Sequence, residues 1–298
     1  MTQTSTTATD TSAPAPPAPT AARRRRGRRP GLYHALMLTA AFAWLIPIIW
    51  MFSLALTPNS VLRRSTTSLF PRDVTLENFL AVFDVGLMFR WFSNSVVVTS
   101  VATVLTVFFC AMAGYAFAKI DFPFRRLVFV FVIAGLMVPK EAMFVPLFLM
   151  FSEADQHNTY QALFLPRIAA PLGVFLMTQF FSQVPPEIEE AARVDGAGRW
   201  RIFWSIMLPL ARPALASLAI FTFVLTWNDY LWPLVSATER EMFTVTTGLA
   251  SLQGNFAQAE ELGSLMARGI VGCLPLLLFF LLFQRQLIRG ITLTSGEK

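Results

Sequence analysis

A small set of polar side chains lies inside otherwise apolar runs of this 298-residue chain. Ionisable groups at membrane depth usually face a protein interior or a water-filled cavity. Aromatic rings stack on the CH faces of a sugar, and neighbouring amide or carboxylate groups bind its hydroxyls. We therefore predict that some of this set lines a path for a hydroxylated solute. The candidates are Lys140, Glu141, Trp227, Asn228, Asp229 and Tyr230.

Other interpretations of the same residues stay open. The aromatic side chains near position 229 are also typical of an interfacial belt, with Asp229 paired to a basic residue of this subunit or its partner. Lys140, Glu141 or Asp229 could relay protons or ions in a self-sufficient secondary transporter. Arg167 and Arg268 are further in-span charges, and prolines near Lys140 and Arg167 predict broken spans that line a cavity.

No pattern for catalysis is present. A phosphate-binding loop needs Gly-Lys followed by Ser or Thr, but the three lysines follow Ala118, Pro139 and Glu297. Cys110 and Cys273 lie in apolar runs and fit small core residues, and no Cys/His metal spacing occurs. We expect a chain that is no enzyme and binds no cofactor of its own.

The segment PPEIEEAARVDGAG (185–198) is a polar island between two apolar runs. Proline suits the first turn of a helix, where carboxylates also favour the positive end of the helix dipole. Gly196 suits a helix stop, because glycine tolerates a left-handed conformation. We predict a helix over 186–195 and a second helical stretch that leads back into the membrane.

This short helix needs something to pack on. Ile188, Ala191, Ala192 and Asp195 recur at helical spacing and predict a small, smooth face that a partner can approach closely. A bland helix resting on the membrane is the alternative. Interfacial helices carry bulky apolar and many basic residues, whereas this one carries three glutamates, which favours a protein partner.

The rest of the chain predicts an all-α integral membrane protein. Its composition is 55% hydrophobic and only 14% charged. A tail at 1–30, rich in Thr, Ala and Pro, is predicted to be disordered. The remainder, 31–292, contains six runs long enough to span a membrane, and 293–298 forms a second tail. The runs are about 34–56, 92–118, 127–150, 160–183, 210–235 and 262–284. Residues 57–91 are predicted to include a short helix at the outer face.

Basic residues set the predicted topology. With the amino terminus inside, 16 of the 24 lysines and arginines fall on the cytoplasmic side, five fall outside and three lie within spans. The positive-inside rule then places both termini and the loop 185–207 in the cytoplasm.

The stretch EEAARVDGAGRWRIFWSIMLPLARPAL resembles the cytoplasmic EAA loop of the membrane-spanning permease subunits of ABC importers. VPKEAMFVPLF, TWNDYLWPL and LPLLLFFLLFQRQLIRGIT are similar to the branch that contains the second permease of maltose-type carbohydrate importers. The resemblance covers roughly 34–292, and the final ITLTSGEK departs from the glycine- and alanine-rich ending of relatives.

The resemblance implies a half-pore in a bacterial-type cell membrane that imports a di- or oligosaccharide. Its implied partners are a second, different permease subunit, two ATPase subunits that hold ATP-Mg, and an extracytoplasmic binding protein. The EAA helix, a short cytoplasmic helix between spans four and five, would dock on an ATPase subunit. The docking residues implied by the motif are Glu190, Ala191, Ala192, Asp195, Gly196 and Ala197. Glycerol 3-phosphate or another polyol is an alternative cargo.

Overall fold

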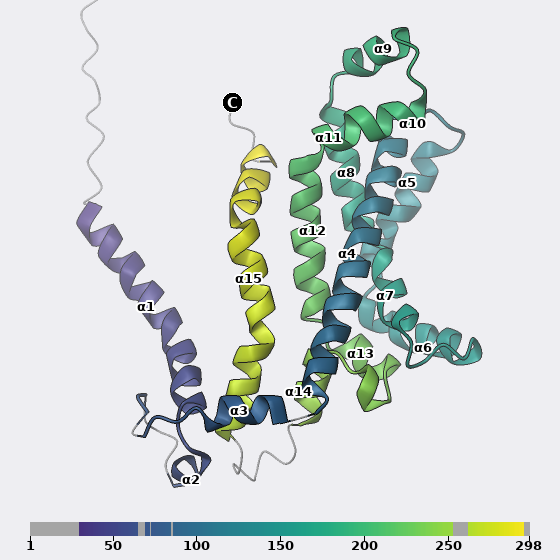
Figure 1. Ribbon diagram of the computed structural model, residues 1–298. Helices are drawn as coiled ribbons and strands as arrows, with labels where there is room; N and C mark the ends of the chain where they lie inside the picture. The colour runs from purple at the N-terminus through teal and green to yellow at the C-terminus, as the bar shows by residue number, and fades with distance from the viewer. Residues whose placement is uncertain (1–29, 65–68, 72, 85, 253–261, 295–298) are drawn as a thin grey trace, which may run out of the picture. The chain divides into compact units, whose positions relative to one another are not determined.

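The computed structural model describes residues 30–64, 69–71, 73–84, 86–252 and 262–294, and all regular structure in these ranges is helical (Figure 1). The predicted tail at 1–30 lies outside the described residues apart from Pro30, and the tail at 293–298 lies outside them from position 295. The chain divides into two compact units, Met1–Pro47 and Ile48–Lys298. The described residues of the first unit, 30–47, belong to one helix, so the architecture below is that of the second.

Helix α1 (Pro30–Ala55) contains the first predicted span. Its apolar stretch Tyr33–Ala55 is long enough to cross a hydrocarbon core. The side chains from Tyr33 to Trp50 are exposed. An apolar helix of this length is costly in water but suits lipid.

Helix α4 (Met88–Lys119) is the central element of the second unit. It packs most extensively against α8 (Pro171–Gln183) and α12 (Arg212–Trp227). A Cβ atom built on Gly114 would lie 2.5 Å from Cβ of Met177 and 2.8 Å from its carbonyl carbon. Glycine at this crossing lets the α4 and α8 backbones approach as small residues do in membrane helix pairs.

Three helices in the described ranges are long and apolar enough to span a membrane, and up to six spans result if each of three bent helix pairs counts as one. The third long helix is α15 (Leu262–Thr294), which extends beyond the predicted end of span six at 284. The bends are 98° at 125–153, 45° at 160–183 and 75° at 199–227. The predicted break in span three is confirmed: it falls at Val138 and Pro139, between α5 with its 3₁₀ turn and the turn that precedes α6. The bounds are α5 Arg125–Ala134, η1 Gly135–Met137, η2 Lys140–Met143, α6 Phe144–Glu153 and α7 Tyr160–Ile168.

The predicted fifth span, 210–235, contains a helix break after Trp227. Its bent helix pair begins at Arg199 and ends at Trp227, and α13 (Leu231–Ser236) is a separate helix. The break has a local cause: Pro233 has no N–H to donate to the carbonyl of Asp229, and its ring would clash there in a continuous helix. That carbonyl accepts a hydrogen bond from Thr246 Oγ1 instead, at 2.6 Å.

The two ends of the second unit carry different short elements. One end carries α9 (Pro186–Val194), α10 (Arg199–Ile202) and α11 (Leu208–Leu210), joined through the π-helical turn Phe203–Met207. The opposite end carries α2, α3, α13 and α14 (Figure 1). Their remaining bounds are α2 Asn59–Leu62, α3 Glu77–Asp84 and α14 Val245–Ser251. The predicted short helix within 57–91 is thus α3.

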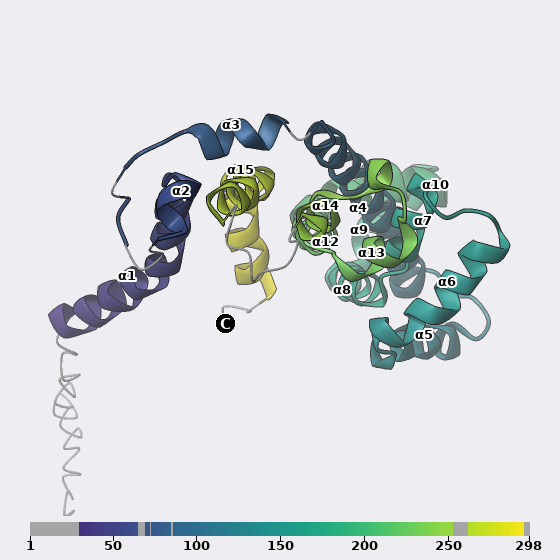
Figure 2. The ribbon, with the colours of Figure 1, turned by 90° about the horizontal axis from the view of Figure 1, so that it is seen from below.

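Buried side chains form a separate core at each of these ends. Tyr115, Phe181 and Phe203 pack below α9, with ring centroids 5.3–5.9 Å apart. Trp91 and Val245 anchor the core of the opposite end. The described residues of α5 and α6 include no buried side chain, and these helices lie at the edge of the bundle (Figure 2).

Candidate functional sites

Helix α9 forms the first candidate site and confirms the predicted helix in the polar island. It begins at Pro186 and ends at Val194, with Asp195 as its C-cap. Gly196 adopts φ +79°, donates to the Arg193 carbonyl at 3.0 Å and is followed by Ala197, which donates to Ala192 at 2.9 Å. These two bonds make a Schellman motif, which satisfies carbonyls at the helix end and reverses the chain.

The exposed face of α9 differs from the predicted one. Ala192 is 8% exposed and packs into the core below the helix, so it cannot offer its side chain to a partner. Glu190, Ala191 and Asp195 are exposed, together with Val194 at 87%. The helix carries alanines at positions 191 and 192, and only one faces outward; periodicity alone did not indicate which face the bundle covers.

One polar contact fixes the start of α9 to α4, and another lies within the helix. Lys119 Nζ, at the end of α4, donates to the carbonyl of Val184 at 2.6 Å, immediately before the prolines. Glu189 is 4% exposed and pairs with Arg193 within α9 at 3.0 Å. The base of the helix is thereby fixed while Glu190, the next residue, stays accessible.

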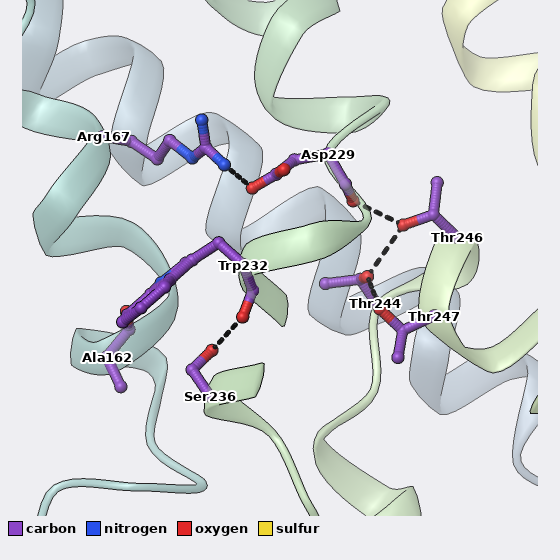
Figure 3. Close-up of polar contacts among 8 residues, drawn as sticks. All are labelled: Ala162, Arg167, Asp229, Trp232, Ser236, Thr244, Thr246 and Thr247. Atoms are coloured by element: carbon purple, nitrogen blue, oxygen red, sulfur yellow. Dashed lines mark hydrogen bonds and ion pairs between the residues drawn. The ribbon is translucent and has the colours of Figure 1, made fainter. Parts of the chain in front are cut away.

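The second candidate site surrounds the break between α12 and α13 (Figure 3). Asp229 forms an ion pair with Arg167, which lies in the last turn of α7. The side chains are 14% and 17% exposed, respectively. This pairing agrees with the alternative in which Asp229 meets a basic residue of its own subunit.

Hydroxyl groups and an indole complete this polar region. Thr246 Oγ1, which donates to the Asp229 carbonyl, lies 3.0 Å from the hydroxyl of Thr244, and that hydroxyl lies 3.1 Å from the one of Thr247. Trp232 Nε1 donates to the Ala162 carbonyl at 2.8 Å, so α13 is tied directly to α7. Backbone groups freed by the helix breaks are thus satisfied within the protein, as a membrane interior requires.

The remaining path candidates fall into two groups. Trp227 is 3% exposed and packs on Phe92 and Phe223, so it belongs to the subunit's own core. Asn228 and Tyr230 flank Asp229 and are exposed. Lys140 and Glu141, in the turn η2, are exposed as well.

A cavity of about 270 Å³ opens beside α10, near the first site. Its walls are almost wholly apolar, and Arg199 supplies the charged group. None of the predicted site residues lines it. Within the described residues no group of three or more His, Cys, Asp or Glu could hold a metal ion.

The sequence reasoning missed two features of these sites. It noted Arg167 and Asp229 separately but did not pair them; their opposite charges inside neighbouring apolar runs were the available signal. It also missed Thr246, because the threonines of the stretch TVTTG (244–248) match no recognised site motif.

Known proteins share sequence similarity with this chain over most of its length. The sequence profile of the family described as "Binding-protein-dependent transport system inner membrane component" matches residues 107–293. The chain is 37% identical to the arabinooligosaccharides transport system permease protein AraQ of Halalkalibacterium halodurans, over 86% of this chain and 94% of that protein. It is 33% identical to the trehalose transport system permease protein SugB of Mycobacterium tuberculosis, over 89% and 97%.

A similar fold occurs in a solved structure. A chain of a bacterial ABC transporter involved in the import of the acidic polysaccharide alginate superimposes with a TM-score of 0.74. The match covers 89% of this chain and 99% of that one, at 24% identity.

Proposed function

The chain belongs to the family of binding-protein-dependent transport system inner membrane components, and from that premise we propose that it is one half of the pore of a carbohydrate importer. The relatives named above carry arabinooligosaccharides and trehalose, which supports a di- or oligosaccharide cargo. Their similarity covers 86% and 89% of this chain, respectively.

The observation that carries the proposal is the exposed face of α9. Glu190 and Asp195 present carboxylates beside Ala191, and the Schellman motif at Gly196 holds the helix end. Carboxylates form strong charge-assisted hydrogen bonds with basic partners, and alanine permits close approach. We propose that Glu190, Ala191, Asp195, Gly196 and Ala197 dock on a cytoplasmic ATPase subunit, with Ala192 supporting the helix from below.

The assembly would contain this subunit, a second and different permease, two ATPase subunits and an extracytoplasmic binding protein. ATP-Mg would be held by the ATPase subunits, because this chain has no phosphate-binding loop. We propose six spans, with each bent pair counted as one, and both termini and α9 on the cytoplasmic side of a bacterial-type cell membrane. The distribution of lysine and arginine along the sequence supports this orientation. Closure of the ATPases would then move α9 and the spans attached to it.

Co-purification tests the docking. Tagged protein would be extracted from its native membrane in mild detergent as wild type, Glu190→Ala and Glu187→Ala. Glu187 is an exposed carboxylate in the first turn of α9 and serves as the matched control. Loss of a charge-assisted hydrogen bond, about 1.5–3 kcal/mol, should lower ATPase recovery about tenfold or more in Glu190→Ala alone.

Transport in proteoliposomes tests the cargo. Uptake of arabinooligosaccharide or trehalose should require ATP and the binding protein, and glycerol 3-phosphate should not compete. Uptake driven by an ion gradient alone, in protein that carries no ATPase, would refute both the docking role and the importer.

A further inference from the structure

The ion pair of Arg167 and Asp229 joins two helix breaks that are distant in the sequence. Arg167 is the penultimate residue of α7, directly before the bend that leads to α8. Asp229 lies in the three-residue linker between α12 and α13. Figure 3 shows the two side chains pointing toward each other across the gap between these elements.

Both residues of the pair are also held by their backbones. The Arg167 carbonyl accepts a hydrogen bond from Thr106 of α4 at 3.2 Å, and the Asp229 carbonyl accepts one from Thr246 of α14. These bonds replace those lost where the helices break. Elements α4, α7, α12 and α14 therefore meet at one pair of charges.

The burial of this pair makes it hard to separate. Removal of one partner would leave the other charge largely buried and uncompensated, which costs more than the pair itself contributes. A movement of the spans should therefore keep the two breaks together. The nearby bond from Trp232 to Ala162 reinforces the same junction.

The linker shows what the pair accomplishes. Its three residues alternate: Asn228 is exposed, Asp229 is turned into the protein, and Tyr230 is 38% exposed. Asn228 is the C-cap of α12, and its side-chain amide donates to the Val224 carbonyl at 2.9 Å, whereas Tyr230 is the N-cap of α13. The anchored residue between them therefore fixes how these two helix ends meet. The amide and phenol groups that remain exposed are suited to hydroxylated solutes.

We infer that Arg167 and Asp229 are a positioning pair: they clamp the breaks of two spans together and hold Asn228 and Tyr230 toward the translocation path. The inference rests on the proposed function for its cargo, but the clamp itself is a property of the chain. The pair acts through its neighbours, so its loss should alter their accessibility and the KM for cargo.

Cysteine labelling tests the clamp without any cargo. The reporter is Asn228→Cys in a background with Cys273→Ser, while the buried Cys110 is retained. The assembled complex is treated with a membrane-impermeant maleimide. In the double variant Arg167→Gln with Asp229→Asn, which leaves no orphan charge, the labelling rate should fall at least about threefold as the linker turns. Glu239→Gln, an exposed carboxylate on the following segment, is the matched control and should stay within about twofold.

The transport readout separates positioning from simple loss of structure. Asp229→Asn and the double variant should raise the KM for cargo about tenfold, whereas basal ATP hydrolysis of the assembled complex stays within about twofold. Arg167→Lys, which keeps the charge, should give an intermediate KM. If no carbohydrate is carried even by the parent protein, the proposed function fails while the labelling result still reports on the clamp. An unchanged or faster labelling rate in a correctly assembled double variant would overturn the inference.

Discussion

Gly196 shows how one residue can set the geometry of a docking helix. Its φ of +79° lies in the left-handed region, yet no atom lies within 4 Å of the position a Cβ would take. Only the backbone conformation therefore opposes a side chain there. Gly198 has equally open surroundings but an ordinary φ of −72°.

We expect Gly196→Ala to destabilise the end of α9 by about 1–2 kcal/mol, because a non-glycine residue is disfavoured at positive φ. Gly198→Ala should change local stability much less, by a few tenths of the value expected for Gly196→Ala. Hydrogen exchange of the α9 amides would measure both. Equal protection in the two variants would show that the Schellman geometry does not require glycine.

Local and long-range features differ in how far the sequence predicts them. Pro186 and Gly196 bound α9 as predicted, because helix start and stop signals act over a few residues. The partner of Asp229 and the burial of Ala192 depend on which elements pack together, and no spacing within the chain encodes that. The docking roles of Glu190 and its neighbours stay predictions.

The helix pair α4 and α8 shows the same contrast at the scale of elements. Helix α8 lies within the predicted span 160–183, and α4 extends slightly beyond 92–118 at both ends, since apolar length identifies spans well. The break between α12 and α13 was not predicted, because Pro233 lies within an apolar run whose hydropathy hides it. The close crossing at Gly114 was also not visible, since a glycine in an apolar helix has many possible reasons.

Substitution of Gly114 should force α4 and α8 apart. A Cβ there would meet backbone atoms of Met177 and Thr178 at 2.8 and 2.9 Å, which cannot move as a flexible side chain could. We expect Gly114→Ala to destabilise the subunit by about 1–3 kcal/mol through overpacking. Gly269→Ala, in α15 with no atom within 4 Å of the added Cβ, should be neutral or stabilising by up to about 1 kcal/mol. Thermal unfolding in detergent compares the two, and similar midpoints would argue against a tight crossing.

At the scale of the whole molecule, basic residues differ in which end of the second unit they occupy. Lys119, Arg125 and Arg199 lie toward the end that carries α9. Arg90, in the first turn of α4, and Arg240, whose carbonyl accepts from Trp91 Nε1, lie toward the opposite end. The long helices thus separate an end with more basic residues, which carries α9, from an end with fewer. The positive-inside rule expects this distribution if α9 lies in the cytoplasm.

The orientation can be measured with two single cysteines in the Cys273→Ser background. Asp121→Cys places a thiol in the loop after α4, where the native side chain is 99% exposed and its ion pair with Arg125 contributes little. Glu239→Cys places one at the opposite end. An impermeant maleimide should label Glu239→Cys in spheroplasts and Asp121→Cys only in inside-out vesicles. The reverse pattern would place α9 outside the cell, where no ATPase could reach it, and would remove the basis of the docking proposal.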